Sequence, residues 1–204
     1  MIDFVTVSFE VKMGKYVKMS PREHVLTRPG MYIGSTSVDK VNMWVLNSDK
    51  NFMEKRELEY IPGLFKIFDE ILVNVLDHSI RLQENPENKQ IKEVHVDINE
   101  NSISVMNNGD GVDVYKHEEH NIYIPEMIFG NMLTSTNYDD SEERTIGGQN
   151  GIGAKACNIY SKVFQIETVD ATRKLLYKQT FRENMSITEP PVITKYTKYP
   201  YTKI

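Results

Sequence analysis

The residues best suited to chemistry lie in the segment 61–81, IPGLFKIFDEILVNVLDHSIR. Pro62 near its start, followed by apolar residues at intervals of three and four, predicts one long helix. At about 100° per residue, one narrow stripe of this helix carries four polar residues: Glu70, Asn74, Asp77 and Arg81. Apolar residues border the stripe, and burying a carboxylate without partners costs several kcal/mol. We therefore expect the stripe to line a cavity that supplies those partners.

A different face of the same helix is apolar and is expected to pack on a core. Its residues are Leu64, Ile67, Phe68, Ile71, Leu72, Val75 and Leu76. In isolation, a Glu and an Asn four residues apart more often form a solvated helix face. That alternative stays open for this helix when it is considered alone.

The second candidate site is the glycine-rich stretch 147–155, GGQNGIGAK. Gly151, Gly153 and Ala156 fit the dinucleotide pattern G-x-G-x-x-A, but no strand precedes them and no βαβ unit surrounds them. Gly153 is followed by Ala154 and Lys155, so the stretch is not a Walker A loop either. Glycines at a helix N-terminus expose backbone N–H groups that can bind an anion such as phosphate. The alternative is a plain tight turn.

Composition limits the class of protein. The chain has 204 residues, 40% of them apolar, so it can bury a good core, and its net charge of −5 argues against a surface that holds a nucleic-acid backbone. Any contact with DNA is therefore expected to be indirect. A single cysteine, Cys157, excludes an internal disulfide and fits a reducing compartment. No apolar run of about 18 residues occurs and the N-terminus is acidic, so we expect a soluble intracellular protein without a membrane segment.

The remaining elements are short. Alternating apolar residues predict strands at 5–11, 43–46, 58–60, 93–98, 103–105, 163–168 and 173–181, and helices are expected at 20–28, 125–133 and 156–160. The sequence NNGDG at 107–111 ends one strand and, taken alone, resembles a turn. The polar stretch 134–146 lacks periodicity, and such loops are most often mobile and functional.

Five blocks in a fixed order carry a resemblance to a known family. They are EHVLTRPGMYIGS, MWV, YIPGLFKIFDEILVN, YIPEMIFGNMLTSTNYDD and GGQNGIGAKACNIYS. These blocks resemble the N-terminal GHKL-type ATPase domain of eukaryotic-type (type IIA) DNA topoisomerases. The resemblance implies an α/β fold, an α+β two-layer sandwich of the Bergerat type with helices on one face of a mixed, largely antiparallel sheet. It also implies an N-terminal strand and dimer arm at 1–27 and the ATPase domain at 28–204. The C-terminal part of this domain could be truncated, and the family's transducer domain is expected to be absent from these residues.

The resemblance gives roles to the polar helix stripe. Glu70 would be the general base that polarises water toward the γ-phosphate, which suits a carboxylate in a partly dry pocket. Asn74 would offer its amide oxygen to Mg²⁺, a cation that prefers oxygen ligands. Asp77 matches an acidic position of the family, without an assigned role.

Other nucleotide contacts follow from the same resemblance. Asn108 would read the adenine, with Gly109 and Gly111 allowing close approach of the backbone. Ser135, Thr136 and Asn137 match a segment that contacts ribose and phosphates. The phosphate loop would comprise Gln149, Asn150, Gly151, Ile152, Gly153, Ala154 and Lys155, with Lys155 as the charged partner.

Three positions depart from the pattern of the family. His78 stands where Asn is usual, Gln149 where Arg is frequent and Ile152 where Tyr is common. One charge on the phosphate side is therefore missing. These departures affect the expected affinity and fine contacts of the site, and leave the expected architecture unchanged.

The resemblance implies an ATP-operated gate of a DNA topoisomerase, with ATP and Mg²⁺ as cofactors. ATP would drive formation of a homodimer in which Tyr16 of the arm closes over the partner's nucleotide, and the full-length enzyme would capture double-stranded DNA. The expected location is the nucleus, or the site of viral DNA replication for a viral protein. These 204 residues alone are expected to bind nucleotide but to hydrolyse it weakly or not at all, because the family's transducer supplies a lysine to the γ-phosphate.

Two other functions stay open. A chaperone or mismatch-repair ATPase gate belongs to the same superfamily, although EHVLTRPGMYIGS and MWV count against it. The second open function is a nucleotide-sensing or protein-interaction module without catalysis, in which Glu70 has a structural role. Tyr16 could likewise be an exposed aromatic residue in a basic tail.

Overall fold

The computed structural model describes residues 18–132 and 151–204. The strand predicted at 5–11 and the polar stretch 134–146 lie outside these residues. The helices are α1 (Pro21–Thr27), the 3₁₀ helix η1 (Pro29–Met31), α2 (Pro62–Gln83), α3 (Ile124–Gly130) and α4 (Gly153–Ile159). The strands are β1 (Asp39–Asn47), β2 (Phe52–Tyr60), β3 (Val94–Ile98), β4 (Ile103–Asn108), β5 (Val163–Asp170), β6 (Leu175–Arg182), β7 (Ile187–Thr188), β8 (Val192–Lys195) and β9 (Tyr201–Lys203).

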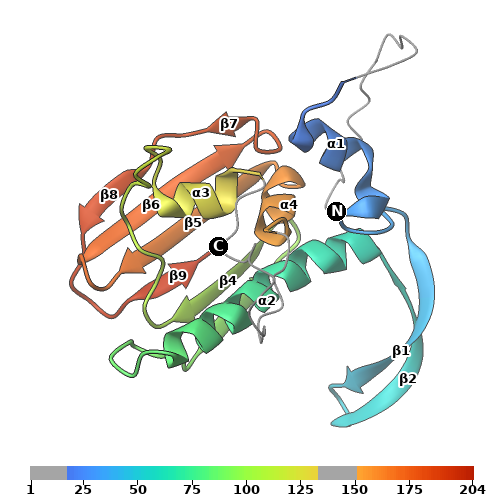
Figure 1. Cartoon of the computed structure of the whole chain (residues 1–204). Helices are drawn as coiled ribbons and strands as arrows, with labels where there is room; N and C mark the ends of the chain where they lie inside the picture. The colour runs from blue at the N-terminus through green and yellow to red at the C-terminus, as the bar shows by residue number, and fades with distance from the viewer. Residues whose placement is uncertain (1–17, 133–150) are drawn as a thin grey trace.

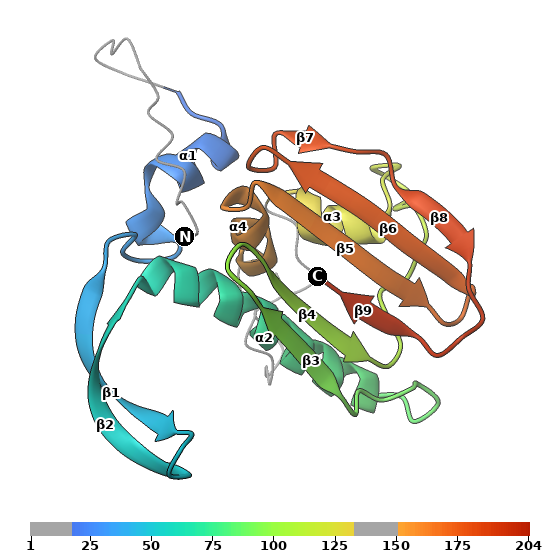
Figure 2. The same cartoon turned by 180° about the vertical axis from the view of Figure 1, so that it is seen from behind.

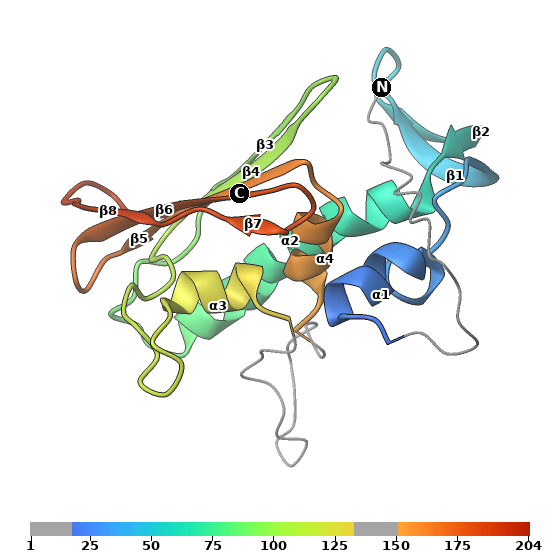
Figure 3. The ribbon, with the colours of Figure 1, turned by 90° about the horizontal axis from the view of Figure 1, so that it is seen from above.

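A seven-stranded sheet forms one layer of the molecule. Its order is β3-β4-β9-β5-β6-β7, and β8 also pairs with β6. Every pair in the described part of this sheet is antiparallel. Helices α2, α3 and α4 lie together on one face of the sheet (Figure 3). The predicted two-layer α/β arrangement is therefore confirmed.

The long predicted helix is confirmed as α2, with Pro62 in its first turn. Ile67, Ile71 and Val75 are buried, as the apolar spacing predicts, and the last two join one core cluster with side chains of the sheet. The prediction for Leu76 is wrong, because this residue is 63% exposed. Leu76 follows Val75 by about 100° of helix rotation, which takes its side chain away from the sheet.

The first two strands form a hairpin that projects from the rest of the fold (Figures 1 and 2). The strands predicted at 43–46 and 58–60 exist, but each is nine residues long. Among the strands of the described ranges they pair only with each other, and their side chains are largely exposed, including Trp44 at 66%. The lengths of β1 and β2 are therefore set by the pairing of the two strands with each other. The prediction from sequence relied on alternating apolar residues, which mark a buried face, and neither strand has one.

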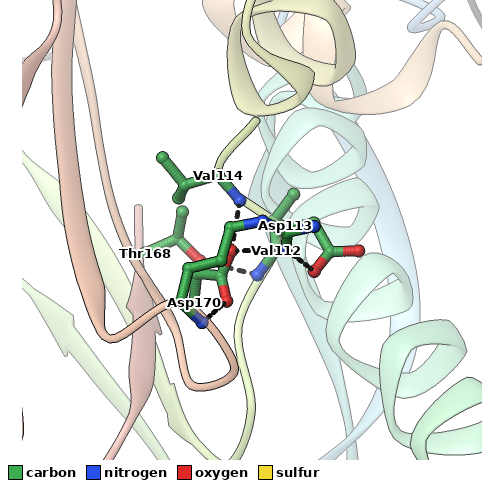
Figure 4. A network of polar contacts seen from close by, with 6 residues as sticks. Val112, Asp113, Val114, Thr168 and Asp170 are labelled. Carbon is green, nitrogen blue, oxygen red and sulfur yellow. Dashed lines mark hydrogen bonds and ion pairs between the residues drawn. The ribbon is translucent and has the colours of Figure 1, made fainter. Parts of the chain in front are cut away.

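The segment after β4 is fastened to the end of β5 by backbone hydrogen bonds (Figure 4). The N–H of Gly111 donates to the Val169 carbonyl at 3.0 Å, and the N–H of Val112 donates to the Thr168 hydroxyl at 2.9 Å. The N–H of Val114 donates to the buried Asp170 carboxylate at 2.7 Å. These bonds fix the path of the segment where it leaves the sheet and passes α2.

Asp170 also accepts from Arg173, through the backbone N–H at 2.7 Å and the guanidinium at 2.9 Å. Burial alone would raise the pKa of Asp170, but the hydrogen bonds from Val114 and Arg173 outweigh burial and lower the pKa. The carboxylate is therefore charged at neutral pH and holds the loop and the β5–β6 turn together.

Replacing Gly111 by Ala is expected to destabilise the fold. A Cβ at this position would lie 2.6 Å from the Val169 carbonyl oxygen and 2.9 Å from its nitrogen, and these backbone atoms cannot rotate away. Overpacking of this kind costs about 1–3 kcal/mol. Chemical denaturation measures the loss, and Gly30→Ala is the control, because no atom lies within 4 Å of a Cβ there. Equal stabilities of the two variants would contradict the close approach.

Candidate functional site

A cavity of about 730 Å³ lies between α2, the segment after β4 and the first turn of α4. The four residues of the predicted polar stripe all line it: Glu70, Asn74, Asp77 and Arg81. Asp77 is only 5% exposed, so this part of the stripe does not face bulk solvent. The prediction that α2 forms a cavity wall is confirmed, and the solvated-face alternative is wrong for this helix.

Glu70 lies directly beside the glycine-rich turn. A Cβ built on Gly153 would lie 2.8 Å from the carboxyl carbon of Glu70, so only glycine leaves room for the carboxylate at this point. The ammonium of Lys66 contacts the Glu70 carboxylate at 2.6 Å, and this hydrogen bond raises the pKa of Lys66. Glu70 is thus placed at the junction of α2 and α4, inside the cavity.

Asn74 is one helical turn beyond Glu70. Its amide nitrogen donates to the Glu70 carbonyl at 2.8 Å, so the amide oxygen is the atom that remains for a cation. The described residues contain no group of three or more His, Cys, Asp or Glu side chains that could hold a metal ion. An amide oxygen is a ligand of the type that hard divalent cations such as Mg²⁺ accept.

The glycine-rich turn forms another part of the cavity wall, next to Glu70. Five residues that were predicted to contact phosphates line it: Gly151, Ile152, Gly153, Ala154 and Lys155. The ammonium of Lys155 donates to the Gly151 carbonyl at 2.6 Å, and the residue is 2% exposed. Desolvation lowers the pKa of Lys155 to about 8.

Several predicted site residues lie outside the described residues. They are Tyr16, Ser135, Thr136, Asn137, Gln149 and Asn150. Their roles stay predictions.

The strand β4 presents its two asparagines to opposite sides. The Asn108 amide oxygen accepts from the N–H groups of Lys92 and Glu93 at 2.8 and 3.0 Å, which ties β4 to the chain entering β3. Neither Asn108 nor Gly109 lines the cavity, whereas Gly111 does. Gly109 has a φ of +101°, a conformation that L side chains rarely adopt, and its Cβ position would lie 2.9 Å from the Lys89 carbonyl. Both residues therefore shape the turn.

Asn107 is the residue that the sequence reasoning missed. It is 3% exposed and lines a second hollow of about 80 Å³, between α2 and the sheet. The signal was present in the alternation of β4, because Ile103, Val105 and Asn107 share one face and Val105 belongs to the core.

The two cavities adjoin. Five residues line both of them: Asn74, His78, Arg81, Val112 and Ile128. The smaller hollow is mainly apolar, with Val75, Val105 and Phe129 in its walls. A slot of this kind beside a polar cavity suits a planar heterocycle joined to an anionic group.

Comparisons with known proteins agree with this arrangement. Residues 60–188 match the family described as histidine kinase-, DNA gyrase B- and HSP90-like ATPase. The chain is 48% identical over 190 residues to DNA topoisomerase 2 of Candida albicans, which covers 93% of this chain and 13% of that protein. It is 48% identical over 194 residues to DNA topoisomerase 2 of Acanthamoeba polyphaga mimivirus, covering 93% of this chain and 15% of the relative.

A solved structure extends the similarity to three dimensions. The ATPase region of Saccharomyces cerevisiae topoisomerase II superimposes with a TM-score of 0.85 at 47% identity, covering 93% of this chain and 49% of that one. The chain thus spans a small part of its curated relatives and about half of this ATPase region. Of the helices in the described ranges, none has the length and apolar character needed to cross a bilayer.

The lowered pKa of Lys155 can be tested directly. We expect its ammonium to lose its proton near pH 8, whereas an exposed lysine titrates near about 10.4. Between these values the native state binds fewer protons than the unfolded state, so the cost of burying the charge is present below pH 8 and disappears as pH rises. NMR of ¹³C-labelled lysine side chains measures the titration, and Lys155→Met identifies the signal by its loss. A midpoint of about 10 or higher would contradict the desolvated environment.

Proposed function

Because the chain belongs to the DNA topoisomerase 2 family and forms part of its ATPase region, we propose that ATP and Mg²⁺ bind in this cavity and operate the gate of a type II DNA topoisomerase. One observation carries the proposal. The Glu70 carboxylate, the Asn74 amide and the Gly151–Lys155 turn surround a single cavity. A hydrolytic base, a cation ligand and an anion-binding turn are thus within reach of one triphosphate.

In the proposed complex the triphosphate lies along the Gly151–Lys155 turn. The Lys155 ammonium supplies positive charge, and the turn supplies backbone N–H groups. The base enters the smaller hollow, where Asn107 takes the role that the sequence assigned to Asn108. The buried position of Asn107 on the cavity side of β4 supports this change.

Hydrolysis then rests on Glu70. The carboxylate accepts a proton from, and orients, the water that attacks the γ-phosphate. Asn74 would hold Mg²⁺, which when bound neutralises charge on the phosphate oxygens. Asp77, buried in the same cavity wall, adds a further acidic group near these phosphates.

The gate function needs two chains. We propose that residues 1–27 form an arm whose Tyr16 reaches over the partner's nucleotide, and that residues 28–204 form the ATPase domain. Nucleotide binding would then favour a homodimer that closes around a DNA duplex, and hydrolysis would reset it. The full-length enzyme would work inside the cell, in the nucleus or at a site of viral DNA replication.

Replacing Glu70 by Gln tests the catalytic role. In the full-length enzyme, the variant is expected to bind ATP but to hydrolyse it about 10²- to 10⁴-fold more slowly, because general-base catalysis is lost. Steady-state ATPase assays measure the rate, and Lys66→Gln is the matched control, because it removes the ion pair and keeps the carboxylate. Unchanged turnover in Glu70→Gln would favour the alternative of a nucleotide sensor in which Glu70 is structural.

The gate proposal predicts association that depends on nucleotide. With a non-hydrolysable ATP analogue and Mg²⁺, the mass in solution should double from the 23.6 kDa of one chain. Tyr16→Ala should weaken this dimer, and Tyr199→Ala, at an exposed tyrosine remote from the arm in sequence, should not. Sedimentation velocity distinguishes the outcomes. A constant mass of one chain at saturating analogue would refute dimerisation through this chain alone.

A further inference from the structure

His78 lies at the boundary of the two hollows and lines both of them. Its Nε2 atom is 2.6 Å from the Asp110 carbonyl oxygen. A carbonyl can only accept, so Nε2 must carry the hydrogen and donate it. This bond joins α2 to the turn after β4.

The tautomer has a consequence for the other ring nitrogen. Burial lowers the pKa of His78, and the hydrogen bond to Asp110 opposes this effect without cancelling it. The ring is therefore neutral at pH 7, and a neutral imidazole whose Nε2 holds the proton has only a lone pair on Nδ1. Any polar contact that the ring makes with a ligand in these hollows must use Nδ1 as an acceptor.

Asn107 offers a second acceptor to the same hollow. Its amide nitrogen donates to the Asn108 carbonyl at 3.1 Å, which leaves its oxygen and its second N–H hydrogen for a ligand. The hydroxyl of Thr202, also in the wall, is paired with Thr168 at 2.8 Å. The described part of the hollow thus offers an acceptor from α2 and one from β4, with the Arg81 side chain also in the wall and mainly apolar neighbours elsewhere.

Two acceptors complement an amino group, which has two hydrogens to donate. The lone pair on Nδ1 of His78 opposes a carbonyl oxygen at the same point, because the two sets of lone pairs would face each other. On the basis of the proposed nucleotide site, we propose that His78 is a specificity-determining residue that accepts a hydrogen bond from the 6-amino group of the purine through Nδ1. His78 thereby favours 6-amino over 6-oxo purines.

Comparing the affinities of three nucleoside triphosphates distinguishes a role of His78 in base recognition from a purely structural role. They are ATP, purine riboside triphosphate, which lacks a 6-substituent, and inosine triphosphate, which has a 6-oxo group. Calorimetry on the wild-type chain should give the tightest binding for ATP and the weakest for inosine triphosphate. In His78→Leu, the preference for ATP over purine riboside triphosphate should fall by about three- to tenfold, the worth of one hydrogen bond.

His78→Gln is the matched variant. Its amide can donate to the Asp110 carbonyl and still offer an oxygen, so it should keep most of the preference. If His78 only supports the turn, His78→Leu will weaken all three ligands equally, and the unchanged ratio would overturn the inference. A wild-type chain that binds none of the three would instead refute the proposed nucleotide site, and the inference with it.

A measurement on the wild-type protein tests the role of Nδ1 without requiring that the variants fold correctly. ¹⁵N NMR of the labelled imidazole should show a lone pair on Nδ1 and a proton on Nε2 in the free chain. Adding ATP should move the Nδ1 resonance as it accepts a hydrogen bond, and adding purine riboside triphosphate should leave it near its free position. Identical responses to the two ligands would overturn the role of Nδ1.

Discussion

The close approach of α4 to α2 at Gly153 is the constraint on which the site depends. A side chain at this position would displace the Glu70 carboxylate from its observed place in the cavity. Helix α4 is held from other directions as well, since Asn158 donates to the Phe129 carbonyl at 3.0 Å and the Tyr160 hydroxyl donates to the Val25 carbonyl at 2.6 Å. With α4 fixed, the Glu70 carboxylate and the glycine-rich turn keep one relative geometry. The cavity is therefore a product of packing between helices that are far apart in the chain.

The two faces of α2 could be predicted from sequence because the spacing of apolar and polar residues in a helix determines the side on which each lies. The three-to-four spacing in α2 identified both the buried face and the polar stripe, and the stripe residues Glu70 to Arg81 line the cavity as expected. The helix expected at 20–28 also forms as α1, and at its start the Ser20 N–H donates to the Glu23 carboxylate at 2.8 Å. Such signals are local, since each residue specifies its own direction from the helix axis.

The sequence was less informative where a residue's position depended on a neighbour. Asn107 and Asn108 are chemically identical, and only the parity of β4 relative to the buried Val105 decides which one faces the smaller hollow. The bond from His78 to the Asp110 carbonyl joins residues 32 positions apart. No periodicity encodes that distance, although the substitution of His for the usual Asn marked the position as unusual.

Strand β9 lies between β4 and β5, although it follows them by many residues in the chain. Ile204 exchanges two backbone hydrogen bonds with Val105, each 2.9 Å long, and its side chain helps to line the smaller hollow. During synthesis on the ribosome, β4 and β5 therefore lack the strand that lies between them until residue 204 has emerged from the exit tunnel. A nascent chain can form α2 early, but the wall of the smaller hollow is incomplete before that moment.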